Sequence, residues 1–195
     1  MTSARPVATV AWVLAFLAMA GGARAETAAE LCKQEFDGYK QKLAKTPEDN
    51  QLWTEFRACV IELKRWNDGA DIGADAIKSH PELWQPHLLI GIAHFHMKEY
   101  QQAVDEFKEA TRLKSDEPLP HYYLGMSYLF LKRPEDAAPA AEQAVTLDPN
   151  NPMNYRQLAY AYLLLDQNDK CEATAKKAIS LDNNDVAAWK SLGNL

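Results

Sequence analysis

The most informative absences in this 195-residue chain are those of chemical motifs. The chain has three cysteines but no Cys-x-x-Cys pair, which argues against thiol exchange and paired-cysteine zinc sites. It also lacks a G-x-S-x-G nucleophile motif and a phosphate-binding glycine loop. Neighbouring acids such as Asp105 and Glu106 fit a solvated helix face better than an acid–base pair. These absences predict a protein that is not an enzyme and needs no cofactor.

Positive charge is scarce as well. The chain has 21 lysines and arginines against 27 acids, a formal net charge of −6. The first 25 residues contain two arginines and no acid, so the remainder has 19 basic residues against 27 acidic ones, or −8. A chain with this balance is a poor candidate for binding nucleic acid or an anionic membrane surface.

Only one long apolar run is present, and it lies at the amino terminus. It extends from Val7 to Met19, about 13 residues, whereas a membrane-spanning helix needs roughly 20. Ala23-Arg24-Ala25 then has the small-x-small pattern at which secretion signals are cut. We predict that residues 1–25 are a cleaved signal peptide and that the mature protein is periplasmic or secreted. An uncleaved anchor is the alternative. We expect no membrane contact beyond export.

A 34-residue repeat organises most of the remaining chain. The stretch His87–His94 reads HLLIGIAH, and His121–Tyr128 repeats it as HYYLGMSY. Small residues follow each stretch at the same offset, as in Ala103 and Ala137. Repeats of this length are typical of stacked helix pairs in which each pair leaves an apolar face for the next. We therefore predict an all-α, right-handed superhelical solenoid of antiparallel helix pairs.

The repeat also sets the expected boundaries. An N-terminal helix is expected within residues 26–49, with Thr27 as a candidate N-cap. Pro139 falls inside an expected helix, so we predict a kink or a late helix start there. The expected array of helix pairs, residues 50–195, consists of 50–83, 84–117, 118–151, 152–185 and a capping helix at 186–195.

These residues resemble the tetratricopeptide repeat (TPR) family. That family has a large–aliphatic–small–aromatic pattern on the first helix of each repeat, small or aromatic residues on the second, and a closing proline. The matching residues include Tyr155, Leu158, Ala159, Tyr162, Ala178, Ala144 and Pro149. The resemblance extends from about Asn50 to Leu195, although Arg57 departs from the pattern at the place of Gly91. It implies a non-catalytic scaffold that binds a protein or peptide partner.

In such an array the concave face is formed by the first helix of each repeat. Here that row is apolar and aromatic, which suits capture of a partner segment. The residues that we expect to contact a partner are Leu88, Ile92, Phe95, Tyr122, Met126, Leu129, Arg156, Tyr160 and Leu163. The alternative is that neighbouring first helices bury much of this row against each other. Some TPR proteins hold a terminal carboxylate with several polar residues, but only Arg156 could serve that purpose here.

The cysteines leave one question open. Cys32 and Cys59 lie on the apolar stripes of successive helices, and export to an oxidising compartment permits a disulfide. A helix register that places Tyr39 opposite Phe56, however, separates the two sulfurs by one turn, about 5 Å along the axis. Both outcomes stay open. If formed, the bridge stabilises the fold by roughly 3 kcal/mol. Cys171 occupies an alanine place in the repeat, and we expect a buried free thiol.

Four histidines, His87, His94, His96 and His121, raise the question of a metal site. A zinc site needs three or four ligands that converge on one point. His87, His94 and His121 occupy repeat positions that face neighbouring helices, whereas His96 points elsewhere. We therefore interpret them as packing residues and expect no metal.

A second function remains open. The helix expected from Val186 is short and has apolar residues, Trp189 and Leu192, that another copy of the chain could cover. The alternative to partner binding is thus a homo-oligomer, a self-assembling structural module that stacks through its open C-terminal end.

Overall fold

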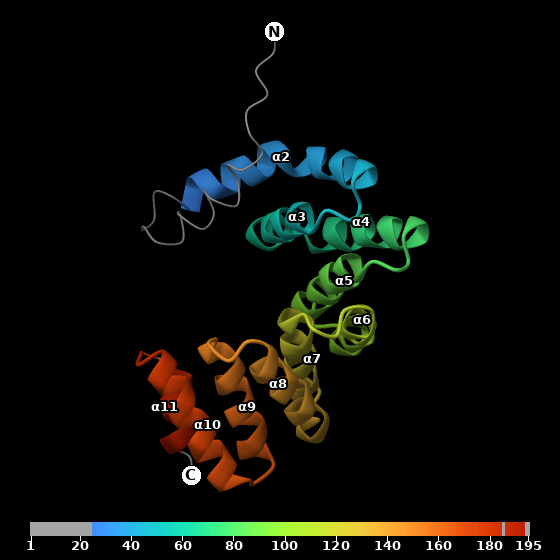
Figure 1. Ribbon diagram of the computed structural model, residues 1–195. Helices are drawn as coiled ribbons and strands as arrows, with labels where there is room; N and C mark the ends of the chain where they lie inside the picture. The colour runs from blue at the N-terminus through green and yellow to red at the C-terminus, as the bar shows by residue number, and fades with distance from the viewer. Residues whose placement is uncertain (1–24, 185, 194–195) are drawn as a thin grey trace. The chain divides into compact units, whose positions relative to one another are not determined.

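The structure is a computed structural model that describes residues 25–184 and 186–193 (Figure 1). The described residues form helices and connecting turns, with no strand among them. They divide into a first unit that ends at Leu89 and a second that begins at Ile90, and each is described by itself. Within the described ranges, no helix is both long and apolar enough for a membrane span. The predicted all-α fold of repeated helix pairs is confirmed.

Helix boundaries follow the 34-residue period. First helices begin at Asn50, Trp84, Pro118, Pro152 and Val186, and second helices at Trp66, Tyr100, Pro134 and Asn168. The first unit contains α2 (Ala25–Lys45), α3 (Asn50–Leu63) and α4 (Trp66–Ser79), and the boundary falls within α5 (Trp84–His96). The second unit contains α6 (Tyr100–Leu113), α7 (Pro118–Phe130), α8 (Pro134–Leu147), α9 (Pro152–Leu164), α10 (Asn168–Leu181) and α11 (Val186–Gly193).

The turn between the two helices of a pair has the same backbone conformation in each repeat. It contains one left-handed residue, at Lys64, Lys98, Lys132 and Asp166, with φ between 52° and 65°. After each of these residues the chain bonds back to the helix that it has left. For example, the Glu99 amide donates to the His94 carbonyl at 2.9 Å. The repeat is therefore a repeat of backbone geometry as well as of side chains.

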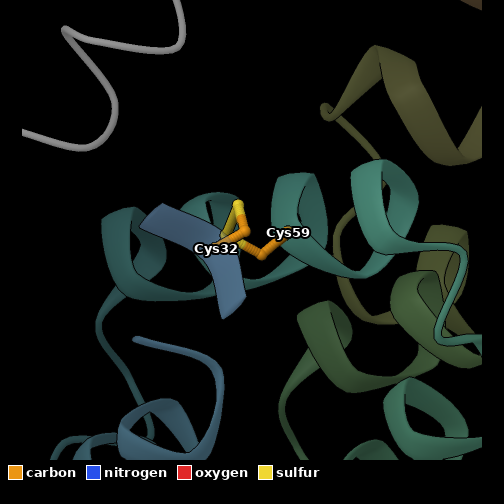
Figure 2. The surroundings of a disulfide bond; sticks show 2 residues. All are labelled: Cys32 and Cys59. Carbon is orange, nitrogen blue, oxygen red and sulfur yellow. A yellow bond between two sulfur atoms is a disulfide. The ribbon is translucent and has the colours of Figure 1, made fainter. Parts of the chain in front are cut away.

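In the first unit, α2 is joined to α3 by a disulfide between Cys32 and Cys59 (Figure 2). Their Cα atoms are 5.1 Å apart, and both side chains are fully buried. The register that predicted separated sulfurs is wrong. It paired Phe56 with Tyr39 alone, whereas the Phe56 ring lies 5.3 Å from Phe36 and 5.5 Å from Tyr39. This shift along α2 brings the cysteines opposite one another.

One further local expectation is wrong, and one of the two alternatives expected at Pro139 is excluded. The helix begins at Ala25, so Thr27 lies inside α2 and is not its N-cap. Pro139 lies inside α8, which runs from Pro134 to Leu147, so the late helix start is not observed. Proline removes one backbone donor. Because Pro139 is the sixth residue of α8, the missing bond falls near the start of the helix.

The helix pairs of the second unit are held together by small side chains on their second helices. Three positions recur at 34 residues and are fully buried in each copy: Ala103, Ala137 and Cys171; Phe107, Ala141 and Ala175; Ala110, Ala144 and Ala178. Cys171 is a buried free thiol, as predicted, and burial raises its pKa. Phe107 is the exception in size, and Gly91 accommodates it. A Cβ at Gly91 would lie 2.5 Å from the Phe107 ring.

The disulfide leads to a first prediction. Thiol titration of the unreduced protein in denaturant should give one thiol per chain, from Cys171, and three after reduction. Reduction should also lower the free energy of unfolding by about 3 kcal/mol, because the open chain gains conformational freedom. Replacing both Cys32 and Cys59 by alanine should abolish that response to reductant. Three thiols without reductant would show that the bridge does not form.

Close packing at Gly91 leads to a second prediction. Gly91→Ala should lower the free energy of unfolding by about 1–2 kcal/mol, since a clash with Phe107 outweighs the better helix propensity of alanine. Gly38→Ala in α2 is the matched control, because its Cβ would meet nothing nearer than Lys42 Cε at 4.0 Å. The control should gain about 0.5–1 kcal/mol. Urea unfolding measures both, and equal gains would contradict the packing account.

Candidate functional site

Exposed apolar side chains in the second unit gather on one layer of helices. The large ones are Phe130, Met153, Tyr160, Leu164, Val186 and Trp189, with exposed fractions between 43% and 64%. All six lie on α7, α9 or α11, the first helices of their repeats. Among the described residues of α6, α8 and α10, no large apolar side chain is comparably exposed. Exposed apolar surface of this kind marks interaction sites.

Helix order explains why these residues form one surface. Each helix from α7 to α11 packs against the next along the chain, and α9 also contacts both α7 and α11 (Figure 1). A groove with a volume of about 340 Å³ lies along these three first helices. Its lining residues are Tyr122, Met126, Leu129, Met153, Arg156, Gln157, Tyr160, Leu163, Ala187, Lys190 and Ser191.

The groove contains most of the residues that the sequence singled out. Six of the nine expected partner-contacting residues line it: Tyr122, Met126, Leu129, Arg156, Tyr160 and Leu163. The other three do not. Leu88 and Ile92 are fully buried, so they offer no surface to a partner. Phe95 packs among other aromatic rings, with its centroid 5.6 Å from Tyr100 and 5.4 Å from Phe130.

Five lining residues were missed by the sequence interpretation, and the repeat itself could have found most of them. Ala187, Lys190 and Ser191 stand 34 residues after Met153, Arg156 and Gln157, which line the same groove. The sequence interpretation treated the last helix as a cap and as a surface for self-assembly, and did not assign its residues to the concave face. Continuing the frame through α11 would have placed these residues on the groove.

Gln157 holds two of the groove helices together. Its side chain is 4% exposed, and its Nε2 donates to the Tyr122 carbonyl on α7 at 2.9 Å. Gly125 permits this approach, because a Cβ there would lie 2.6 Å from Gln157 Nε2. The Gln157 Oε1 atom is buried and has no hydrogen-bond partner. This hydrogen bond therefore helps to fix the position of α7 relative to α9 at the groove.

Tyr122 and Arg156 form a polar pair within the groove. Burial raises the pKa of the Tyr122 hydroxyl, and the charge and hydrogen bond of Arg156 lower it by less. The hydroxyl therefore stays protonated at neutral pH and keeps both a donor and an acceptor. A smaller hollow of about 190 Å³ shares Tyr122 and Met153 with the groove and is also lined by Asp148.

The histidines and a hollow in the first unit are weaker candidates for a functional site. Within residues 25–184 and 186–193, no three metal-ligating side chains of His, Cys, Asp or Glu converge. His94 Nδ1 lies 2.6 Å from Glu99 Oε2, and His121 Nε2 lies 3.0 Å from the Ser115 carbonyl oxygen. Both are contacts at the protein surface. A hollow of about 220 Å³ in the first unit is lined in part by Lys40 and Asp75, an ion pair at 3.3 Å.

Family models define the class of protein. Two models, both described as tetratricopeptide repeat, match residues 85–117 and 128–194. The matched ranges contain 33 and 67 residues, together 100 of 195, and they include the groove helices α9 and α11 but only the last three residues of α7. The chain belongs to the tetratricopeptide repeat family. No curated protein sequence matches it significantly.

Solved structures agree with this fold. TTC0263, a thermophilic TPR protein of Thermus thermophilus, is 18% identical with a TM-score of 0.69, covering 95% of this chain and 96% of its own. YrrB, a TPR protein described as having an unusual peptide-binding site, is 17% identical with a TM-score of 0.67 and 80% coverage of both chains. The first TPR domain of Spaghetti (RPAP3), bound to an HSP90 peptide, is 19% identical with a TM-score of 0.52, covering 53% and 82%.

Proposed function

We propose that this protein is a non-catalytic interaction module that binds a segment of a partner protein in the groove along α7, α9 and α11. The observation that carries the proposal is that, among the described residues of the second unit, the exposed large apolar side chains lie on those three helices alone. Peptide binding by YrrB and by the RPAP3 domain supports the proposal by analogy of fold.

The size and chemistry of the groove favour a peptide segment. At about 340 Å³ it lies at the small end of ligand pockets, which suits a few side chains of a longer segment. Met126, Leu129 and Leu163 offer apolar contact, and Tyr160 offers a ring that is 46% exposed. Apolar burial on such contacts contributes roughly 25 cal/mol per Å² before the costs of association. Because the three helices pack together, these side chains are already in position before a partner binds.

Removing the groove tyrosines should weaken partner binding. A peptide selected on the intact protein should bind the Tyr122→Ala, Tyr160→Ala double variant at least about tenfold more weakly, since aromatic anchors dominate such interfaces. Fluorescence anisotropy with the labelled peptide measures the dissociation constants.

The matched control for this experiment is Tyr155→Ala. Tyr155 also lies on α9, but it is not a groove residue, and its ring has Lys177 Nζ of α10 at 5.9 Å from its centroid. The control should bind as the intact protein does. Circular dichroism confirms that each variant is folded. Unchanged peptide binding by the Tyr122→Ala, Tyr160→Ala variant would contradict the proposal.

We propose further that the chain is exported and that residues 1–25 are removed. Residues 1–24 lie outside the described part of the structure, so this proposal rests on the apolar run and the small-x-small pattern. The Cys32–Cys59 disulfide supports it, because such bonds persist in oxidising compartments. Mass spectrometry of protein expressed with its signal in a bacterial host should give a mature chain that begins at Glu26. A chain that keeps residues 1–25 would contradict cleavage.

Self-association is the second candidate. Val186 and Trp189 on α11 are 64% and 52% exposed, so apolar surface is available on that helix. Sedimentation velocity over a wide concentration range tests it, and a strict monomer rules it out. Partner binding is favoured because the exposed apolar surface continues from α11 across α9 to α7.

A further inference from the structure

Among the helices of the second unit, acidic side chains lie on the second helices alone, which also contain five lysines and arginines. The second helices α6, α8 and α10 contain eight acidic residues: Asp105, Glu106, Glu109, Glu135, Asp136, Glu142, Asp169 and Glu172. The first helices α7, α9 and α11 contain none. Their only two charged residues are Arg156 and Lys190. The groove layer is thus positive in a chain whose formal net charge is −6.

Both cations lie on the groove. Arg156 of α9 and Lys190 of α11 occupy the same repeat position, 34 residues apart, and both are lining residues. Tyr122 holds that position on α7, so its hydroxyl and the two cations come from the same place in three successive repeats. No acidic residue is among the lining residues of the groove. The remaining large lining residues are methionine, leucine and tyrosine, apart from Gln157.

We infer that the partner segment is apolar and contains at least one acidic side chain, which is bound at Arg156 and Lys190. The inference rests on the proposed function and adds the chemistry of its partner. An arginine presents a rigid fork of donors to a carboxylate, and the lysine adds a second positive charge. A basic segment would bring like charges together and leave both cations without compensation by the partner. Asp148 lines the neighbouring hollow and not the groove, so it does not reverse this preference.

The net charge of the whole chain favours a basic partner, in contrast to the two groove cations. An overall charge of −6 repels an acidic partner at long range and attracts a basic one. In physiological salt, however, exposed charges are screened beyond about 8 Å. A carboxylate seated in the groove is within contact distance of the cations, whereas the described acids of the second unit lie on the other layer of helices or in the connecting turns and none lines the groove. We therefore expect the local cations to decide specificity.

Selection from a random peptide library tests the inference, because it does not require that the partner be identified. The probe is a nine-residue library displayed on phage and selected on the immobilised full mature chain. Enriched peptides should be rich in leucine, phenylalanine and similar residues, with aspartate and glutamate exceeding lysine and arginine. The most enriched peptide is then synthesised with blocked termini, which removes the terminal carboxylate as a source of negative charge. Glutamine in place of its acidic residue should weaken binding about fivefold, the scale of a partly exposed ion pair.

Two double variants separate the groove cations from charge in general. Arg156→Gln with Lys190→Gln should abolish the difference between the acidic and glutamine peptides. Arg112→Gln with Lys176→Gln removes the same two residue types from α6 and α10 and should preserve it. Arg156→Lys keeps the charge and should retain most of the difference in affinity between the two peptides. This variant tests the role of the charge even if glutamine at position 156 disturbs the contact with Tyr122.

The outcomes distinguish this inference from the proposed function. Apolar peptides enriched without a preference for acids, or with a preference for bases, would overturn the inference and leave the groove as a binding site. A preference that survives Arg156→Gln with Lys190→Gln would also overturn it. No enrichment relative to the Tyr122→Ala, Tyr160→Ala variant would overturn both.

Discussion

Close approach of paired helices is the constraint on which the second unit depends. It requires small side chains on the second helices, and Ala110, Ala144 and Ala178 show the pattern at one position in three repeats, each fully buried. Where a large residue, Phe107, replaces a small one, Gly91 on the facing helix provides the space. Packing of this density leaves no room for additional methylenes. The 34-residue period of the sequence results from this requirement for small side chains.

The groove is a consequence of that packing. Small residues bury the contact within each pair, and the larger side chains on the opposite side of the first helices stay exposed, as Tyr160 and Met153 do. Contacts of α9 with α7 and α11 place these side chains side by side. Gln157 fixes part of the arrangement through its bond to the Tyr122 carbonyl. A rigid apolar surface of this kind needs little reorganisation when a partner binds, which favours affinity.

The sequence predicted those features that the repeat determines and failed where single contacts decide. Helices begin at Pro118 and Pro152 because the period and the prolines both mark those starts. The sequence left open whether neighbouring first helices bury this row. It did not separate the buried Leu88 from the exposed Tyr160, since one rule for the inner face was applied equally to every repeat, although burial differs along the array. The Cys32–Cys59 bridge could not be decided from the sequence because the axial register of two helices depends on how Phe56 packs, which periodicity does not contain.

The sequence also contains the charge distribution. The arrangement of the acidic residues could not be recognised, however, before each residue was assigned to a first or a second helix. Net charge alone describes an acidic protein, and only the assignment of residues to first and second helices shows that the acids of the second unit's helices lie in one layer. Lys190 illustrates the point, because its role follows from its place one repeat after Arg156. Sequence position in a repeat protein thus becomes informative once each repeat has been divided into its two helices.

Methionine-methyl NMR tests the central claim, that partners bind along α7, α9 and α11, most directly. The described part of the chain contains Met97, Met126 and Met153, of which Met126 and Met153 line the groove and Met97 does not. Titration with a selected peptide should shift the methyl signals of Met126 and Met153 in parallel and leave that of Met97 unchanged. A shift of Met97 alone, or saturating binding with no shift at Met126 and Met153, would contradict the account.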